Sequence, residues 1–198
     1  MNSKKIISVL LVVALVMSIF ALTSCKKEED VLTVYTNAEF PPFEYLSDNK
    51  PVGVDMQIAQ AIADELGMKL EIKNVKFDTI LTSISSGKGD LGIAGITVTP
   101  ERAESVNFSE NYITSTQYMV IKNDSEIKTI EDLAGLKIGV QLGTTGDFII
   151  SDEISGTEDE ETGEHVKGVL EGTGATVTQY NSAADAAVNM NSGKVDVV

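Results

Sequence analysis

The sequence predicts an α/β protein made of two consecutive parts. Short apolar, β-branched segments alternate with helical patterns between residues 31 and 93. A second alternation of the same kind begins near residue 129 and continues to residue 198. In each part, one strand pattern ends in small and hydroxyl residues directly before a helix start, at 94–102 and at 141–147. Strands that alternate with helices indicate parallel sheets covered by helices.

Composition excludes several classes of function. The chain has 198 residues, with 30 acidic and 15 basic side chains and a formal net charge of −15. Such an acidic chain cannot present the basic stripe that neutralises nucleic-acid phosphates. The sequence holds one cysteine and one histidine, so we expect no internal disulfide, no metal site and no cofactor.

The first 24 residues have the pattern of a signal peptide. Two lysines precede an apolar run over residues 6–22, and "LTSC" ends at Cys25. This ending resembles the lipobox of bacterial lipoproteins. The resemblance implies cleavage before Cys25, lipid on its sulfur, a lipidated linker over 25–30, and a protein held at the extracytoplasmic face of the cell membrane. The alternative is an uncleaved signal anchor in which the cysteine has no role.

The first part of the mature chain is expected to begin with a strand over residues 31–36 and a proline-containing, aromatic-rich loop over 37–48. A helix then covers about 55–66, with Asp55 as its cap and Gly67 after its end. The remaining elements are a strand over 69–75, a short helix capped by Asp78, and a strand over 90–93.

The second part is expected to contain two extended segments and then a second series of strands and helices. The extended segments cover 106–108 and 116–121, and the series comprises a short helix over 130–133, a strand over 137–140, a helix over about 147–154, a strand over 175–180, a helix over 183–191 and a strand over 195–198. We place the crossing at 118–124, with lobe 1 over 31–119 and lobe 2 over 120–198. An acidic insertion over about 155–172 is interpreted as a solvated loop. Calcium binding is the alternative interpretation of its acids, but they lack EF-hand spacing.

The stretch "AGITVTPER", residues 94–102, contains the only arginine of the chain, Arg102. Thr99 followed by Pro100 is typical of a helix cap with proline in the first turn. A strand end that meets a helix N-terminus favours anions, and a guanidinium adds a fork that matches a carboxylate. This stretch is therefore a candidate carboxylate site. The alternative is a surface arginine paired with Glu101 or Glu104.

Two further features support a binding site rather than an active site. "GTTG" at 143–146 repeats the strand, polar turn and helix start in the second part, and it lacks the ending of a phosphate-binding Walker loop. The aromatic residues near 40 either pack in the core or form the wall of a pocket, where Phe77 could face Phe40. No catalytic set is evident, and Glu39 is the one candidate general acid.

Five stretches together resemble the amino-acid-binding branch of the extracellular solute-binding proteins of ABC importers, family 3. These stretches are "YTNAEFPPFEY", "PVGVDMQIAQAIADELG", "KFDTILTSISSGKGDLGIAGITVTPERAESVNFSENY", "EDLAGLKIGVQLGTTGD" and "NSGKVDVV". The resemblance implies a two-lobed periplasmic-binding-protein (Venus-flytrap) fold, a monomer, an amino-acid ligand, and delivery of that ligand to ABC permease subunits. A sensing module and a dehydratase-like enzyme of the same fold are the alternatives.

The same resemblance assigns roles to individual residues. Arg102 would hold the α-carboxylate of the ligand, and the other expected ligand-binding residues are Asn37, Phe40, Phe77, Ala94, Gly95, Thr97, Gln141, Thr144 and Thr145. Asn37 stands where relatives often have an acid, which makes a cationic ligand less assured. The chain stops within an apolar run, so we expect it to be C-terminally truncated, and the acid for the α-ammonium is expected beyond residue 198.

Overall fold

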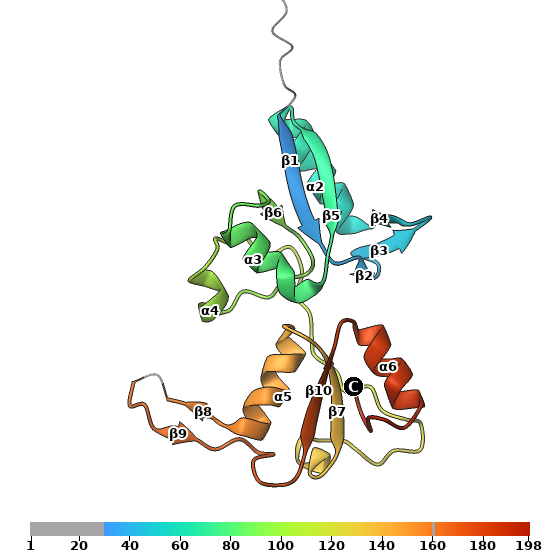
Figure 1. Cartoon of the computed structure of the whole chain (residues 1–198), viewed down its shortest axis with the longest axis vertical. Coiled ribbons are helices and arrows are strands. Elements are labelled where there is room, and N and C mark those ends of the chain that lie inside the picture. The colour runs from blue at the N-terminus through green and yellow to red at the C-terminus, as the bar shows by residue number, and fades with distance from the viewer. Residues whose placement is uncertain (1–29, 160) are drawn as a thin grey trace, which may run out of the picture. The chain divides into compact units, whose positions relative to one another are not determined.

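The computed structural model describes residues 30–159 and 161–198, and residues 31–198 form one compact unit. The predicted signal peptide and Cys25 lie outside the described residues. Two parallel sheets organise the unit, in the order β5-β1-β6 and β10-β7 (Figure 1). The first combines β1 (Val31–Thr36), β5 (Lys69–Asn74) and β6 (Leu91–Gly92), and the second combines β7 (Lys137–Gln141) and β10 (Thr176–Tyr180). The predicted parallel pairing is confirmed.

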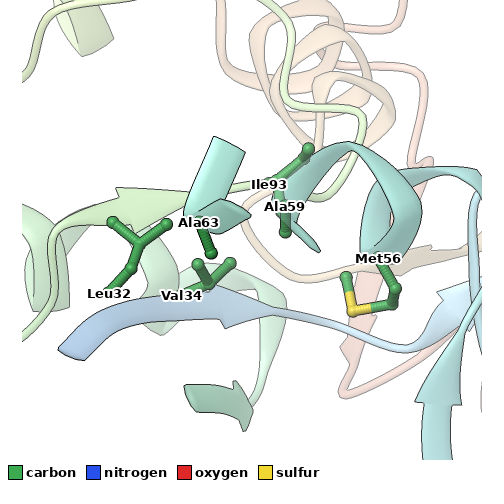
Figure 2. Close-up of a cluster of buried hydrophobic side chains, with 6 residues drawn as sticks. All are labelled: Leu32, Val34, Met56, Ala59, Ala63 and Ile93. Atoms are coloured by element: carbon green, nitrogen blue, oxygen red, sulfur yellow. The ribbon is translucent and has the colours of Figure 1, made fainter. Parts of the chain in front are cut away.

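Helix α2 (Val54–Leu66) covers the first sheet and closes its core. Figure 2 shows the cluster, in which β1 and α2 contribute most side chains: Leu32, Val34, Met56, Ala59, Ala63 and Ile93. The helix ends at Gly67 in the left-handed conformation, as predicted. The expected cap is wrong, because Gly53 holds the N-cap position and Asp55 is fully buried in the first turn.

The prediction of a loop over 37–48 is also wrong, because this segment contains two of the three strands of an antiparallel sheet. Strands β2 (Glu39–Phe40), β3 (Glu44–Ser47) and β4 (Lys50–Val52) pair in sequence order. The tight turn between β3 and β4 consists of Asp48 and Asn49, both at positive φ. Asp and Asn tolerate this conformation better than other side chains, and two such residues in a row form a hairpin turn.

Between β5 and the second sheet the chain forms short helices. A 3₁₀ turn, η1 (Phe77–Thr79), runs into α3 (Ile80–Ser85), and α4 (Pro100–Ala103) follows β6. The expected cap at Asp78 is wrong, because Asp78 lies within η1 and Thr79 occupies the position before α3. The cap of α4 is confirmed, since Thr99 Oγ1 accepts from the Arg102 N–H at 3.3 Å.

The second part contains η2 (Glu131–Leu133), α5 (Thr145–Ser155) and α6 (Ala183–Asn191) around its sheet. Its core combines residues of the sheet and of the flanking segments: Leu133, Ile138, Val140, Leu170, Ala175 and Val197. The strand expected over 195–198 is reduced to one bridge between Ile138 and Val197. The segments 106–108 and 116–121 form no strand, although Val120 exchanges two backbone hydrogen bonds with Val198.

The acidic insertion contains a small hairpin rather than only a loop. Strands β8 (Thr157–Glu158) and β9 (His165–Val166) pair antiparallel, and His165 Nε2 lies 2.8 Å from Glu171 Oε2. Within the described residues, no helix has both the length and the apolar character needed to cross a bilayer.

Candidate ligand-binding site

A cavity of about 620 Å³ is lined by residues from both parts of the chain. Nine of the ten ligand-binding residues expected from the sequence lie in its wall: Asn37, Phe40, Phe77, Ala94, Gly95, Thr97, Gln141, Thr144 and Thr145. They lie at or after the carboxyl ends of four parallel strands, β1, β5, β6 and β7. Ligands of open α/β sheets bind at such ends.

Arg102, the tenth residue, is buried next to this wall without being part of it. Its Nη1 donates to the Thr97 carbonyl at 2.7 Å, and its Nη2 donates to the Gly143 carbonyl at 2.9 Å. The side chain is 7 % exposed, and the alternative of a surface arginine is therefore wrong. Burial lowers the pKa of Arg102, yet a guanidinium remains charged at neutral pH. Two of its five N–H groups are used in these bonds, which leaves donors for an anion.

Two aromatic rings flank the Arg102 guanidinium. Its carbon Cζ lies 6.0 Å from the centre of the Phe77 ring and 5.4 Å from that of Phe148. Cation–π contacts at these distances hold the planar group in place. Phe40 stacks on Phe43 with ring centres 5.6 Å apart, so the hypothesis that it faces Phe77 stays a prediction. Phe40 is 46 % exposed, which fits a cavity wall better than a core position.

The turn at 143–146 forms the start of α5 as predicted. Thr144 caps the helix by accepting from the Asp147 N–H at 3.3 Å, and its hydroxyl donates to the Gln141 carbonyl at 2.8 Å. The buried Asp147 carboxylate accepts from the Gly143 N–H at 2.9 Å and from Gln179 Nε2 at 2.9 Å. These bonds hold the backbone at Gly143, and the carbonyl of the next peptide unit, Gly143–Thr144, accepts from Arg102.

An amide pair joins the two parts at another point of the cavity. Gln141 Nε2 donates to Asn37 Oδ1 at 3.0 Å, and Asn37 Nδ2 donates to the Val75 carbonyl at 2.9 Å. Asn37 is buried, so its amide is held by partners on both sides. The cavity therefore presents polar groups at two places, near Arg102 and near Asn37.

The ionisable side chains in the described cavity wall are two carboxyls, Glu39 and Glu44, and one phenol, Tyr118. The pKa of Glu39 is raised by burial and by the neighbouring Asp185 carboxylate on α6. Glu44 is 1 % exposed, and burial together with Asp55 raises its pKa to about 9. With Arg102 behind the wall, the arrangement suits a small molecule that carries both a carboxylate and positive charge.

The sequence interpretation missed three residues in or beside this wall. They are Glu44 and Asp55, which are both buried, and Tyr112, which is 44 % exposed and donates its hydroxyl to Asp55. A signal for Asp55 existed, because it precedes the buried Ala59 by four residues and the buried Ala63 by eight, and so lies on the apolar stripe of α2. An acid on such a stripe indicates a buried partner.

Comparison with known proteins identifies close relatives. The family model for bacterial extracellular solute-binding proteins, family 3, matches residues 32–198. The arginine-binding extracellular protein ArtP of Bacillus subtilis (strain 168) is 37 % identical over 132 residues, which cover 63 % of this chain and 52 % of that protein. A probable histidine-binding protein of Neisseria gonorrhoeae is 32 % identical over 164 residues, covering 76 % and 60 %.

Solved structures give the same result. An ancestral arginine-binding protein bound to arginine matches with a TM-score of 0.73 and 38 % identity, over 86 % of this chain and 69 % of that one. The chain thus spans about half to three fifths of the curated relatives named above. The likeness confirms the predicted two-lobed α/β fold class.

Proposed function

Because the chain belongs to family 3 of the bacterial extracellular solute-binding proteins, we propose that it binds a free amino acid in the 620 Å³ cavity. The observation that carries this proposal is the position of Arg102. A buried guanidinium, held by carbonyls from both parts of the chain, stands directly behind a wall of hydroxyl and backbone groups. A buried cation with free donors is best matched by a carboxylate.

The α-carboxylate of the ligand is placed between the two helix starts. Arg102 supplies the fork, Thr97 a hydroxyl, and Thr145 the first N–H groups of α5. Thr144 shapes this turn through its cap. A helix N-terminus of this kind stabilises an anion through its unpaired N–H groups.

The ligand side chain is placed toward the other polar region and is proposed to be cationic. Phe40 and Phe77 flank its apolar stem, and Asn37, Gln141 and Glu39 meet its end. Like charge from Asp185 disfavours ionised Glu39, and a cation between the two carboxylates would relieve that repulsion. The arginine-binding relatives support this choice.

The wider role follows the family. We propose a monomer with lobe 1 over 31–119 and lobe 2 over 120–198, anchored by lipid on Cys25 at the extracytoplasmic face of the membrane. It delivers its ligand to the permease of an ABC importer, and the proposal includes no catalysed step. Closure of the lobes on the ligand would signal occupancy to the permease.

Calorimetric titration with each of the twenty amino acids tests the proposal. We expect heat from arginine, with lysine or histidine weaker, and none from aspartate or glutamate, because Glu39 lines the cavity next to the Asp185 carboxylate. Heat from an uncharged amino acid alone would retain amino-acid binding and reject the cationic side chain. Twenty flat titrations of folded protein would reject the function.

A further inference from the structure

Two buried carboxyl groups are neighbours at the cavity, and one of them, that of Glu44, belongs to the cavity wall. Glu44 on β3 is 1 % exposed and Asp55 in the first turn of α2 is fully buried. The Asp55 N–H donates to the Phe43 carbonyl at 2.9 Å, and this backbone bond holds the start of α2 against β3. Among the described residues, neither Glu44 Oε2 nor Asp55 Oδ1 has a hydrogen-bond partner, although both atoms are buried.

One proton between the two side chains gives both of these oxygens a partner. Two ionised carboxylates in this position would repel each other and leave buried acceptors unsatisfied. A protonated Glu44 can donate to Asp55, which removes both penalties. The pKa of Glu44, raised to about 9 by burial and by Asp55, agrees with this geometry.

The other oxygen of Asp55 continues the chain of hydrogen bonds to the cavity. Tyr112 donates its hydroxyl to Asp55 Oδ2 at 3.1 Å, and the same hydroxyl accepts from the Gly95 N–H at 3.0 Å. Ala94 and Gly95 both line the cavity. The C=O and N–H of a trans peptide point in opposite directions, so this bond also fixes the direction of the Ala94 carbonyl.

The groups that act on this chain of bonds are few. Besides burial, Asp55 raises the pKa of Glu44. Asp55 and Glu44 also raise the pKa of Tyr112, and the hydrogen bond from the Gly95 N–H lowers it. Burial and the two carboxyls raise the pKa of Tyr112 well above its ordinary value, so its hydroxyl keeps its proton and remains a donor. None of the resolved effects on these groups comes from a lysine, arginine or histidine.

We propose that Glu44, Asp55 and Tyr112 are positioning residues that hold the Ala94–Gly95 peptide at the cavity wall, and that Glu44 does so in its protonated form. Loss of that proton places a second negative charge beside Asp55 and loosens the chain of bonds that ends at Gly95. The effect on ligand binding rests on the proposed function, whereas the shared proton does not.

Carboxyl NMR tests the shared proton without any ligand. In full-chain protein labelled with ¹³C at glutamate side chains, one resonance is expected to titrate near pH 9 rather than near 4.5, the ordinary Glu value. Its absence from the spectrum of Glu44→Gln assigns it. If that variant does not fold, Asp55→Asn serves instead, because removal of the neighbouring charge moves the Glu44 titration to lower pH. A Glu44 midpoint near the ordinary value in the wild type overturns the proposal.

Unfolding by denaturant at several pH values gives a second readout. In the folded state Glu44 holds its proton up to about pH 9, whereas its ordinary pKa is 4.5. The contribution of this proton to the free energy of unfolding is therefore complete below the unfolded-state pKa, and it is lost as pH rises from that value to the folded-state pKa. Glu44→Gln, whose amide still donates to Asp55, is expected to lack this loss. Equal pH dependence of wild type and variant overturns the proposal.

Tyr112→Phe tests the positioning role, with Tyr45→Phe as its control. Removing the hydroxyl breaks both bonds, and arginine affinity is expected to fall about tenfold. Tyr45 does not line the cavity, and its variant is expected to bind like the wild type. Unchanged affinity in Tyr112→Phe refutes positioning. If wild-type protein does not bind arginine, the proposed ligand fails, and the titration of Glu44 still decides the shared proton.

Discussion

Arg102 combines two tasks in one side chain. It donates to Thr97 and Gly143 carbonyls, which belong to different parts of the chain, and it is the cation behind the cavity wall. Lysine has the same charge but no planar fork, and it cannot reach both carbonyls and an incoming carboxylate in the same geometry.

Replacing Arg102 by alanine or by lysine should therefore weaken ligand binding. We expect Arg102→Ala to cost roughly 2–5 kcal/mol of binding free energy, as for the loss of one partner of a buried charge pair. Arg102→Lys should recover only part of this, and calorimetry with arginine measures both. Lys88→Ala removes the same charge from an exposed site outside the cavity and should bind normally. Normal binding by a well-folded Arg102→Ala would contradict the assigned role.

At the scale of elements, α2 depends on a glycine that no other residue can replace without distortion. Gly53, at the N-cap position, has φ 124°, and a Cβ there would overlap the Phe43 carbonyl oxygen. Gly67, at the other end, has φ 66°, but a Cβ there would meet no atom within 4 Å. A side chain at Gly67 would thus meet backbone strain alone, whereas a side chain at Gly53 would meet both backbone strain and steric overlap.

Alanine at these two ends should have unequal effects on stability. Gly67→Ala is expected to cost about 1 kcal/mol of unfolding free energy, since only the left-handed conformation is penalised. Gly53→Ala should cost more than roughly 3 kcal/mol, because φ strain and overlap with backbone add together. Urea unfolding compares the two variants, and equal costs would mean that the backbone at Pro42 and Phe43 moves aside without penalty.

Elements with local signals were predictable, and those set by distant partners were not. The helix at Ala183–Asn191 was predicted with its observed bounds, because its start follows a capping serine and its pattern is periodic. The sheet over 39–52 was missed because two prolines and several polar residues suggested a loop, although Asp48 and Asn49 form a recognisable hairpin turn.

The site shows the same division. Its wall was anticipated through a family resemblance, and nine of the ten residues lie together in the structure. Tyr112 could not be found in this way, because its partner Asp55 is 57 positions away in the sequence. A hydrogen bond between such distant residues has no periodicity and no spacing that a single sequence reveals.

At the scale of the whole molecule, charge should govern how fast a ligand arrives. The chain carries a formal net charge of −15, which attracts cations over distances that salt screens. The association rate of arginine, followed by stopped-flow tyrosine fluorescence, is expected to fall about tenfold between low and high ionic strength. Glutamine, an uncharged amino acid of similar size, is the control ligand and should show little change. Parallel slopes for the two ligands would argue against steering by the molecular field.

The Asn37–Gln141 amide pair has a consequence for selectivity. Asn37 Oδ1, which would accept from a ligand's donor, already accepts from Gln141 Nε2. Every ligand must therefore compete with the Gln141 amide for the lone pairs of this oxygen. A neutral donor gains nothing by displacing the Gln141 amide. A cationic group forms a stronger hydrogen bond with Asn37 Oδ1 and can therefore displace it. Ligand selection at this end of the cavity is then an exchange of hydrogen-bond donors. The strength of the Gln141–Asn37 bond sets the minimum bond strength that a ligand's donor has to exceed.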